Sequence, residues 1–330
     1  MAETLTNEQI VKALELPTDI ITTLRTAEGK TFEAASNQFL DALFNKVIYQ
    51  TVESMEFENP FKVYDGFPIN YGDTIENIYV ELPKGYKFNK DATDPFAKAK
   101  PSIKTLYATI NYELQYETTI EDSLLRRAVL NEYGFMNLIN TILNSLVKAM
   151  SIDEYFAQIT VLNNPSLYAN GIQNITKGAT DEETASIITK TIVDTYTDMA
   201  LPSKDNNAYK TLNASNKSNI VLVIKQKLLN DINLDYLKGV FNLDKVDLIK
   251  KIIPVKTFQT TNEQGTPVGD DIDFVIFDTK AFDNHIALQD GGMIYNPKGK
   301  YTNHYTNLWK VFGFKYFYNA KAFKLVNAAW

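Results

Sequence analysis

The sequence predicts an α+β protein organised around one long helix, and three patterns indicate this fold class. Residues 135–162 contain no proline or glycine, and their apolar side chains recur at helical spacing. Residues 74–82 and 104–120 alternate apolar and polar side chains, which is typical of strands. Residues 219–224 (NIVLVI) are apolar throughout, as expected of a strand covered on both faces.

The long helix is the best-defined element. Its apolar stripe consists of Phe135, Ile139, Ile142, Leu146, Ala149, Phe156 and Ile159. At about 1.5 Å per residue the helix would run roughly 40 Å. Asn163, Asn164 and Pro165 follow it and end it. We expect Leu146 to be buried, because it lies on this stripe.

An N-terminal arm precedes the strands. Short helices are predicted at 6–14 and 18–25, with breaks at Pro17 and Gly29, and a further helix at 37–49. Such an arm is expected to be ordered only where a partner holds it. Residues 1–60 carry ten acidic and four basic side chains, a local net charge of −6.

The two alternating strands predict an extended hairpin with a basic tip. A polar segment at 83–102 joins them, which suits a hairpin reaching away from its own domain. Around the tip stand six lysines, Lys84, Lys87, Lys90, Lys98, Lys100 and Lys104, against Asp91 and Asp94, a local net charge of +4. The lysines either keep an exposed loop soluble or contact an acidic surface of another subunit.

The remaining elements follow in order. The patterns predict a short helix at 120–131, a loop at 165–178, a helix that Thr180 caps and Pro202 stops, and a loop at 203–218. Next come a helix at 228–242, strands at 250–255 and 273–277 with an exposed turn at 259–271 between them, a short helix at 281–285, and strands at 310–318 and 321–326. The mixture at 203–305 predicts a compact α/β subdomain inserted before the last strands.

Composition excludes several classes of function. The chain has no cysteine, so disulfides, thiolate nucleophiles and cysteine-ligated zinc are excluded. Two histidines leave little for histidine-based metal or triad chemistry. The net charge of −7 disfavours binding to a phosphate backbone. No apolar run reaches the length of a membrane helix, and the polar N-terminus is unlike a signal peptide, so we expect a cytoplasmic site of synthesis.

Candidate chemical sites do not form a catalytic set. The segment Gly291–Lys300 lacks the first glycine and the hydroxyl residue of a phosphate-binding loop, and a turn is the better interpretation. Three further groups are a carboxylate cluster (Asp270, Asp271, Asp273), a glutamate group (Glu53, Glu56, Glu58) and His304. The cluster lacks the glutamate of a calcium loop, the glutamates suit a solvated face, and His304 suits a hydrogen-bonded interior. We therefore predict no enzyme activity, no cofactor and no metal.

The order of the segments resembles the major capsid proteins of tailed bacteriophages with the Hong Kong 97-type fold, and within them those of phi-29-type podophages. The stretch TIENIYVEL, the basic tip and PSIKTLY resemble the family's extended hairpin, the E-loop. The passage YETTIEDSLLRRAVLNEYGFMNLINTILNSLVKAMSIDEY resembles the entry to its spine helix. NIVLVIKQKLLNDINLDYLKGVFNLDKVDLIKKIIPV resembles its A-domain, and NPKGKYTNHYTNLWKVFGFKYFYNAKAF its closing P-domain strands.

The resemblance implies four regions. They are an N-terminal arm and helix (1–60), an E-loop (61–119), a P-domain (120–202 with 306–330) carrying the spine helix 135–162, and an A-domain (203–305). The extra immunoglobulin-like domain of some family members is not expected, since the chain stops at Trp330, and the turn at 259–271 is longer than the family's usual connection.

The resemblance also implies a function. It implies pentamers and hexamers of an icosahedral phage head that encloses double-stranded DNA without binding it specifically. The implied partners are scaffolding and portal proteins, with assembly in the host bacterial cytoplasm and no membrane. Lys84, Lys87 and Lys90 become candidates for an inter-subunit contact. Two alternatives remain open: a shell protein of an encapsulin-type compartment and, less favoured, a carboxylate-based hydrolase.

Overall fold

The structure, a computed structural model, describes residues 19–26, 57–69, 72–85, 100–122, 132–232, 251–261 and 266–327, with isolated positions at 31, 34, 35, 38, 87 and 98. Its contacts divide the chain into two compact units. One comprises Met1–Asn59, Tyr112–Tyr155 and Ala287–Trp309; the other comprises Pro60–Asn111, Phe156–Ile286 and Lys310–Trp330. The helices predicted at 6–14 and 37–49, and with them most of the arm, lie outside the described residues.

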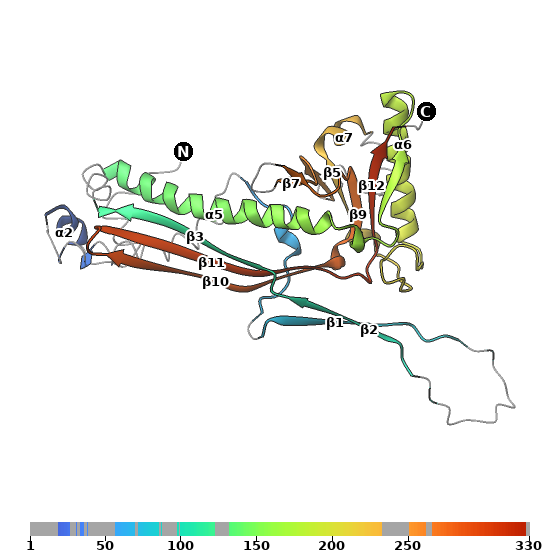
Figure 1. Ribbon diagram of the computed structural model, residues 1–330, viewed down its shortest axis with the longest axis horizontal. Helices are drawn as coiled ribbons and strands as arrows, with labels where there is room; N and C mark the ends of the chain where they lie inside the picture. Colours follow the sequence, from blue (N-terminus) through green and yellow to red (C-terminus); the bar gives the residue numbers. More distant parts are fainter. Residues whose placement is uncertain are drawn as a thin grey trace. The chain divides into compact units, whose positions relative to one another are not determined.

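The long helix is confirmed as α5, Glu132–Leu162 (Figure 1). Leu146 is 7% exposed and Ile159 is 1% exposed, as the stripe predicts. The backbone N–H of Asn163 donates to the carbonyls of Ile159 and Thr160 and ends the last turn. One member of the stripe was wrongly placed, because Phe156 is 48% exposed.

The hairpin is confirmed by the antiparallel pairing of β1, Thr74–Val80, with β2, Ile103–Thr109. The single strand predicted at 104–120 is wrong, because the chain forms β2 and then β3, Tyr112–Glu121. Asn111 marks the break. Its side-chain amide donates to the carbonyl of Phe312 at 2.8 Å, and its side-chain oxygen accepts from the N–H of Phe312 at 2.9 Å.

A three-stranded sheet has the order β10-β11-β3, with β10 at Phe282–Asn296 and β11 at Tyr301–Phe314. The short helix predicted at 281–285 is wrong: a 3-10 turn, η4 (Thr279–Ala281), leads directly into β10. Residues 282–285 are all buried. The sequence therefore lacks, at this point, the alternation of buried apolar and exposed polar side chains that identifies a strand. The strand predicted at 310–318 is the second half of β11 and ends at Phe314. The helix predicted at 120–131 is wrong for its first two residues, which belong to β3, and its remainder is largely undescribed.

The main core lies around a five-stranded sheet of order β4-β12-β9-β5-β6. Figure 1 labels its strands β5, β9 and β12. The strands are β4 (Ile172–Thr176), β12 (Ala320–Val326), β9 (Phe274–Asp278), β5 (Ile220–Lys225) and β6 (Ile252–Val255). Pairings β4–β12 and β5–β6 are parallel, and β9 is antiparallel to both of its neighbours. The loop predicted at 165–178 is therefore wrong in part, because β4 adds a short edge strand there.

Helix α6, Asp181–Met199, packs its buried residues Ile188, Ile192 and Tyr196 against this sheet. Its start is as predicted: the hydroxyl of Thr180 accepts from the N–H of Glu183, whose carboxylate accepts from the N–H of Ala179. The helix predicted at 228–242 begins as α7, Gln226–Asp231, and its remainder lies beyond the described residues. The helix predicted at 18–25 is α2, Ile20–Thr26.

Short elements complete the described chain. The turn at 259–271 contains a small hairpin of β7, Thr260–Thr261, and β8, Pro267–Val268. Three 3-10 turns are η1 (Lys62–Tyr64), η2 (Pro165–Leu167) and η3 (Lys217–Asn219). The predicted regional boundaries stay a prediction; the five-stranded sheet draws strands from within 203–305 and from outside it.

Candidate assembly interface

The β1–β2 hairpin has one face without cover among the described residues. Directly paired residues of an antiparallel ladder point to the same side. The register pairs Glu76 with Tyr107, Ile78 with Thr105, and Val80 with Ile103. Large apolar side chains on this face are 55–62% exposed: Ile78 57%, Val80 56%, Ile103 55% and Tyr107 62%. Such a stripe of exposed apolar surface is typical of a site that another molecule covers.

The opposite face of the hairpin is anchored to its own subunit. The hydroxyl of Tyr79 donates to the carbonyl of Leu212 at 2.7 Å, and its ring stacks on Phe317 with centroids 5.3 Å apart. The ammonium of Lys104 donates to the carbonyl of Tyr209 at 2.7 Å and lies 3.3 Å from a carboxylate oxygen of Glu81. The hairpin is therefore held on one face, whereas its other face is exposed within the part of the chain that the structure describes.

Electrostatics on the anchored side follow from these contacts. Hydrogen bonds from Ser102 and Lys104 lower the pKa of the Glu81 carboxyl, so this group keeps its charge beside Lys104. Burial raises the pKa of the Tyr79 hydroxyl. Lys104, which the sequence grouped with the tip lysines, therefore takes part in anchoring the hairpin.

The predicted tip lysines are partly described. Lys84 and Lys87 are exposed, as are Lys98 and Lys100 on the returning side. Lys90 lies outside the described residues. Lysine side chains thus stand on both chain segments that flank the undescribed end of the hairpin.

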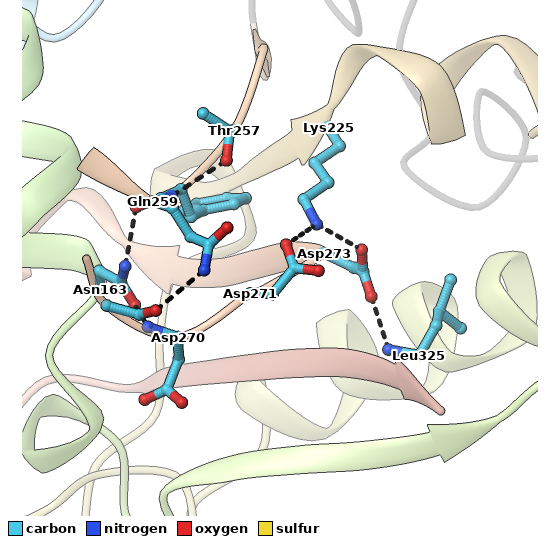
Figure 2. Close-up of polar contacts among 10 residues, drawn as sticks. Asn163, Lys225, Thr257, Gln259, Asp270, Asp271, Asp273 and Leu325 are labelled. Atoms are coloured by element: carbon cyan, nitrogen blue, oxygen red, sulfur yellow. Dashed lines mark hydrogen bonds and ion pairs between the residues drawn. The ribbon is translucent and has the colours of Figure 1, made fainter. Parts of the chain in front are cut away.

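Two carboxylates of the cluster form ion pairs with the ammonium of Lys225, as Figure 2 shows. The ammonium of Lys225 lies 2.5 Å from Asp271 Oδ1 and 2.9 Å from Asp273 Oδ1, and Asp273 Oδ2 accepts from the N–H of Leu325 at 2.6 Å. Burial acts to lower the pKa of Lys225, but the hydrogen bonds that its ammonium donates to the two carboxylates outweigh burial, and the pKa is raised. The site is an ion pair that joins β5 to the start of β9.

Asn163, just after α5, fixes the base of the turn at 259–271 (Figure 2). Its side chain donates to the carbonyl of Phe258 at 2.8 Å and accepts from the N–H of Asp270 at 3.0 Å. Gly269 has φ +95°, and a Cβ there would lie 2.1 Å from the Asn163 amide nitrogen. Only glycine fits this approach.

The other candidate residues serve structural roles or lie apart. The segment Gly291–Lys300 ends β10 and turns into β11, and the side chain of Asn296 accepts from the N–H groups of Lys298 and Gly299. His304 is buried in β11, and burial lowers its pKa to about 4. Glu58 is exposed, whereas Glu53 and Glu56 are undescribed. Within the described ranges no group of three or more His, Asp or Glu residues could hold a metal ion, and no helix could cross a membrane.

Comparison with known sequences decides the family. The family model described as Phi29-like phage major capsid protein matches residues 4–324, which is nearly the whole chain. The chain belongs to this family.

Relatives of this capsid family member include the major capsid protein of Bacillus phage B103, 26% identical over 298 residues. That match covers 88% of the chain and 64% of the relative, so the chain spans less than two thirds of the B103 protein. The major capsid protein of Bacillus phage PZA is 24% identical, with 92% of the chain and 72% of the relative covered.

The fold of this family member is also found in solved structures. The capsid structure of Staphylococcus phage Andhra aligns with a TM-score of 0.67 at 14% identity, covering 82% of the chain and 85% of that protein. The shared fold is the Hong Kong 97-type fold of tailed-phage capsids, as the sequence predicted.

Sequence reasoning missed the main feature of the hairpin, which is the contrast between its two faces. Both faces of β1 and β2 carry large side chains, such as Ile75 and Ile78, so alternation alone does not tell which face is covered. The cross-strand register and the anchors from distant residues supply this information.

Proposed function

We propose that the protein is a phage major capsid protein that assembles into pentamers and hexamers of an icosahedral head around double-stranded DNA. The observation that supports it most is the hairpin anchored on one face and uncovered on the other, in a chain of the capsid family. A surface of this kind is stable in a repeated assembly, where a neighbouring copy covers it. The net charge of −7 suits an enclosure that does not bind DNA tightly.

Family membership supports further parts of the proposal. The protein acts without enzyme activity, cofactor or membrane. It assembles in the host bacterial cytoplasm with scaffolding and portal proteins, and it ends in the virion. Its regions act as an arm (1–60), an E-loop (61–119), a P-domain (120–202 with 306–330) and an A-domain (203–305).

The proposed inter-subunit contact combines charge and apolar burial. Lys84, Lys87 and Lys90 lie across an acidic surface of the adjacent subunit, and the stripe of Ile78, Val80 and Ile103 is covered there. A single exposed ion pair contributes at most about 1 kcal/mol. Burying apolar side chains contributes more, at ~25 cal/mol per Å². The lysines therefore steer encounter and register, and the apolar stripe supplies affinity.

Electron microscopy of the purified protein tests assembly. Closed shells that package DNA are the expected result with the phage components present. Shells filled with a cargo protein would favour an encapsulin-type compartment, and a small monodisperse species would contradict shell function.

A triple substitution tests the role of the tip. Changing Lys84, Lys87 and Lys90 to Glu should leave the subunit folded, since the side chains of Lys84 and Lys87 are exposed, and should strongly slow assembly. The matched control changes three exposed lysines of the body, Lys177, Lys190 and Lys227, to Glu, with the same change in net charge. Light scattering follows the rate. Equal assembly rates for the tip variant and the unmodified protein would contradict the proposed contact and would indicate that the lysines only keep the loop soluble.

A further inference from the structure

A buried carboxylate contacts the first strand of the hairpin. Asp283, the second residue of β10, has a side chain 1% exposed. The side-chain amide of Asn77, in the middle of β1, donates to its Oδ2. The ammonium of Lys315, just after β11, lies 3.1 Å from its Oδ1. One carboxylate thus joins the hairpin to two segments that come later in the chain.

His285 extends this cluster to the segment before the hairpin. Its Nε2 lies 3.1 Å from Asp283 Oδ1, and its Nδ1 lies 2.8 Å from the carbonyl of Phe67. The Phe67 ring also contacts the His285 ring, with centroids 4.5 Å apart. A Cβ at Gly66 would lie 2.4 Å from the His285 ring, so glycine is needed for this approach. The cluster therefore holds the chain on the way into β1.

Both flanks of the hairpin depart from regular strand structure. Gly72, two residues before β1, has φ +80°, a conformation that glycine adopts at little cost. After β2, Ile110 and Asn111 interrupt the strand. An isolated two-stranded hairpin is marginally stable and its direction is not fixed by its own pairing. Contacts with the subunit must therefore set the direction.

We propose that Asp283 is a positioning residue that sets the direction of the β1–β2 hairpin through Asn77. A buried carboxylate keeps its hydrogen-bond donors because an unsatisfied buried charge is costly. Moving β1 away would remove the Asn77 donor from Asp283, whereas His285 and Lys315 would remain. The inference concerns one subunit and goes beyond the proposed function, because it holds whether or not the subunit enters a shell.

The chain contains no cysteine, so paired spin labels can be placed without background. One cysteine replaces Lys84, near the end of the hairpin, and another replaces Lys190, exposed on α6. Double electron–electron resonance then measures the distance distribution between the labels in unassembled subunits. Asn77→Asp, which opposes Asp283 with a like charge, should shift the distribution or widen it at least about twofold. Asn77→Ser, which restores a shorter donor, should lie between Asn77→Asp and the unmodified subunit.

Glu76→Gln is the matched control. Glu76 precedes Asn77 in β1, but its side chain lies on the uncovered face, where its carboxylate accepts a hydrogen bond from the hydroxyl of Tyr107. Its distribution should equal that of the unmodified subunit. Hydrogen exchange gives a second measurement: amides of β1 and β2 should exchange about tenfold faster in Asn77→Asp, and those of β5 and β9 should be unchanged. An unchanged distance distribution in a folded Asn77→Asp subunit would overturn the inference. Equal acceleration in all four strands would also overturn it, by indicating a general loss of stability.

Discussion

At the scale of single residues, the burial of a side chain in the folded structure decides its charge. His304 illustrates this, since it alternates along β11 with exposed or half-buried neighbours and is itself 1% exposed. The sequence predicted an interior histidine, and the buried position confirms it. The effect of burial on its charge could not be predicted, because it depends on strands far apart in the sequence packing around the ring.

The lowered pKa of His304 predicts acid sensitivity. The unfolded chain binds a proton near pH 6.5, whereas the folded protein binds it only near pH 4. The stabilising effect is therefore complete above about pH 6.5 and is lost as the pH falls toward 4. Between pH 7 and 5 we expect a loss of about 2 kcal/mol in the free energy of unfolding. Urea unfolding of the protein and of His304→Gln at both pH values measures it, and an equal loss in both proteins would contradict the assignment.

At the scale of elements, the helices and strands with a clear hydrophobic period were the ones that the sequence predicted best. Helix α5 was predicted almost to its ends, because a long uninterrupted 3.6-residue period has few alternatives. β10 was missed because its first four residues are buried on both faces and Gly291 and Gly292 interrupt its second half. β4 was missed because an edge strand of five residues depends on its partner β12, in which Ala322 pairs with Ile172 across 150 positions of the chain.

The apolar stripe of α5 predicts the effect of a charge. Leu146→Asp places a carboxylate in a buried position and removes the packing of the leucine, and we expect a cost of at least about 3 kcal/mol. The adjacent Ser145 is exposed, so Ser145→Asp is the matched control and should change stability by less than ~0.5 kcal/mol. Thermal unfolding and solubility measure both. A soluble Leu146→Asp protein with an unchanged melting temperature would contradict the packing of α5.

At the scale of the whole molecule, family and fold could be predicted from the order of the segments, but the interface could not be fully predicted. The lysines of the tip were found from sequence because charge is read directly. The uncovered stripe of Ile78, Val80 and Ile103, and the anchor at Asp283, required the strand register and contacts between residues about 200 positions apart.

Ionic strength separates the two parts of the proposed contact. Added salt screens the attraction of the tip lysines, so raising it from about 0.05 to 0.5 M should slow assembly of the unmodified protein. The variant with Lys84, Lys87 and Lys90 changed to Glu should lose this dependence. Light scattering over a salt series measures both. A rate that does not change with salt would contradict electrostatic steering.

The uncovered stripe of the hairpin has a thermal consequence. Burial of apolar surface is favoured by the entropy of water near room temperature and weakens on cooling. Shells closed through this stripe would therefore loosen in the cold, although each subunit stays folded by its own core. Chilled preparations would release subunits, and rewarming would let them close again.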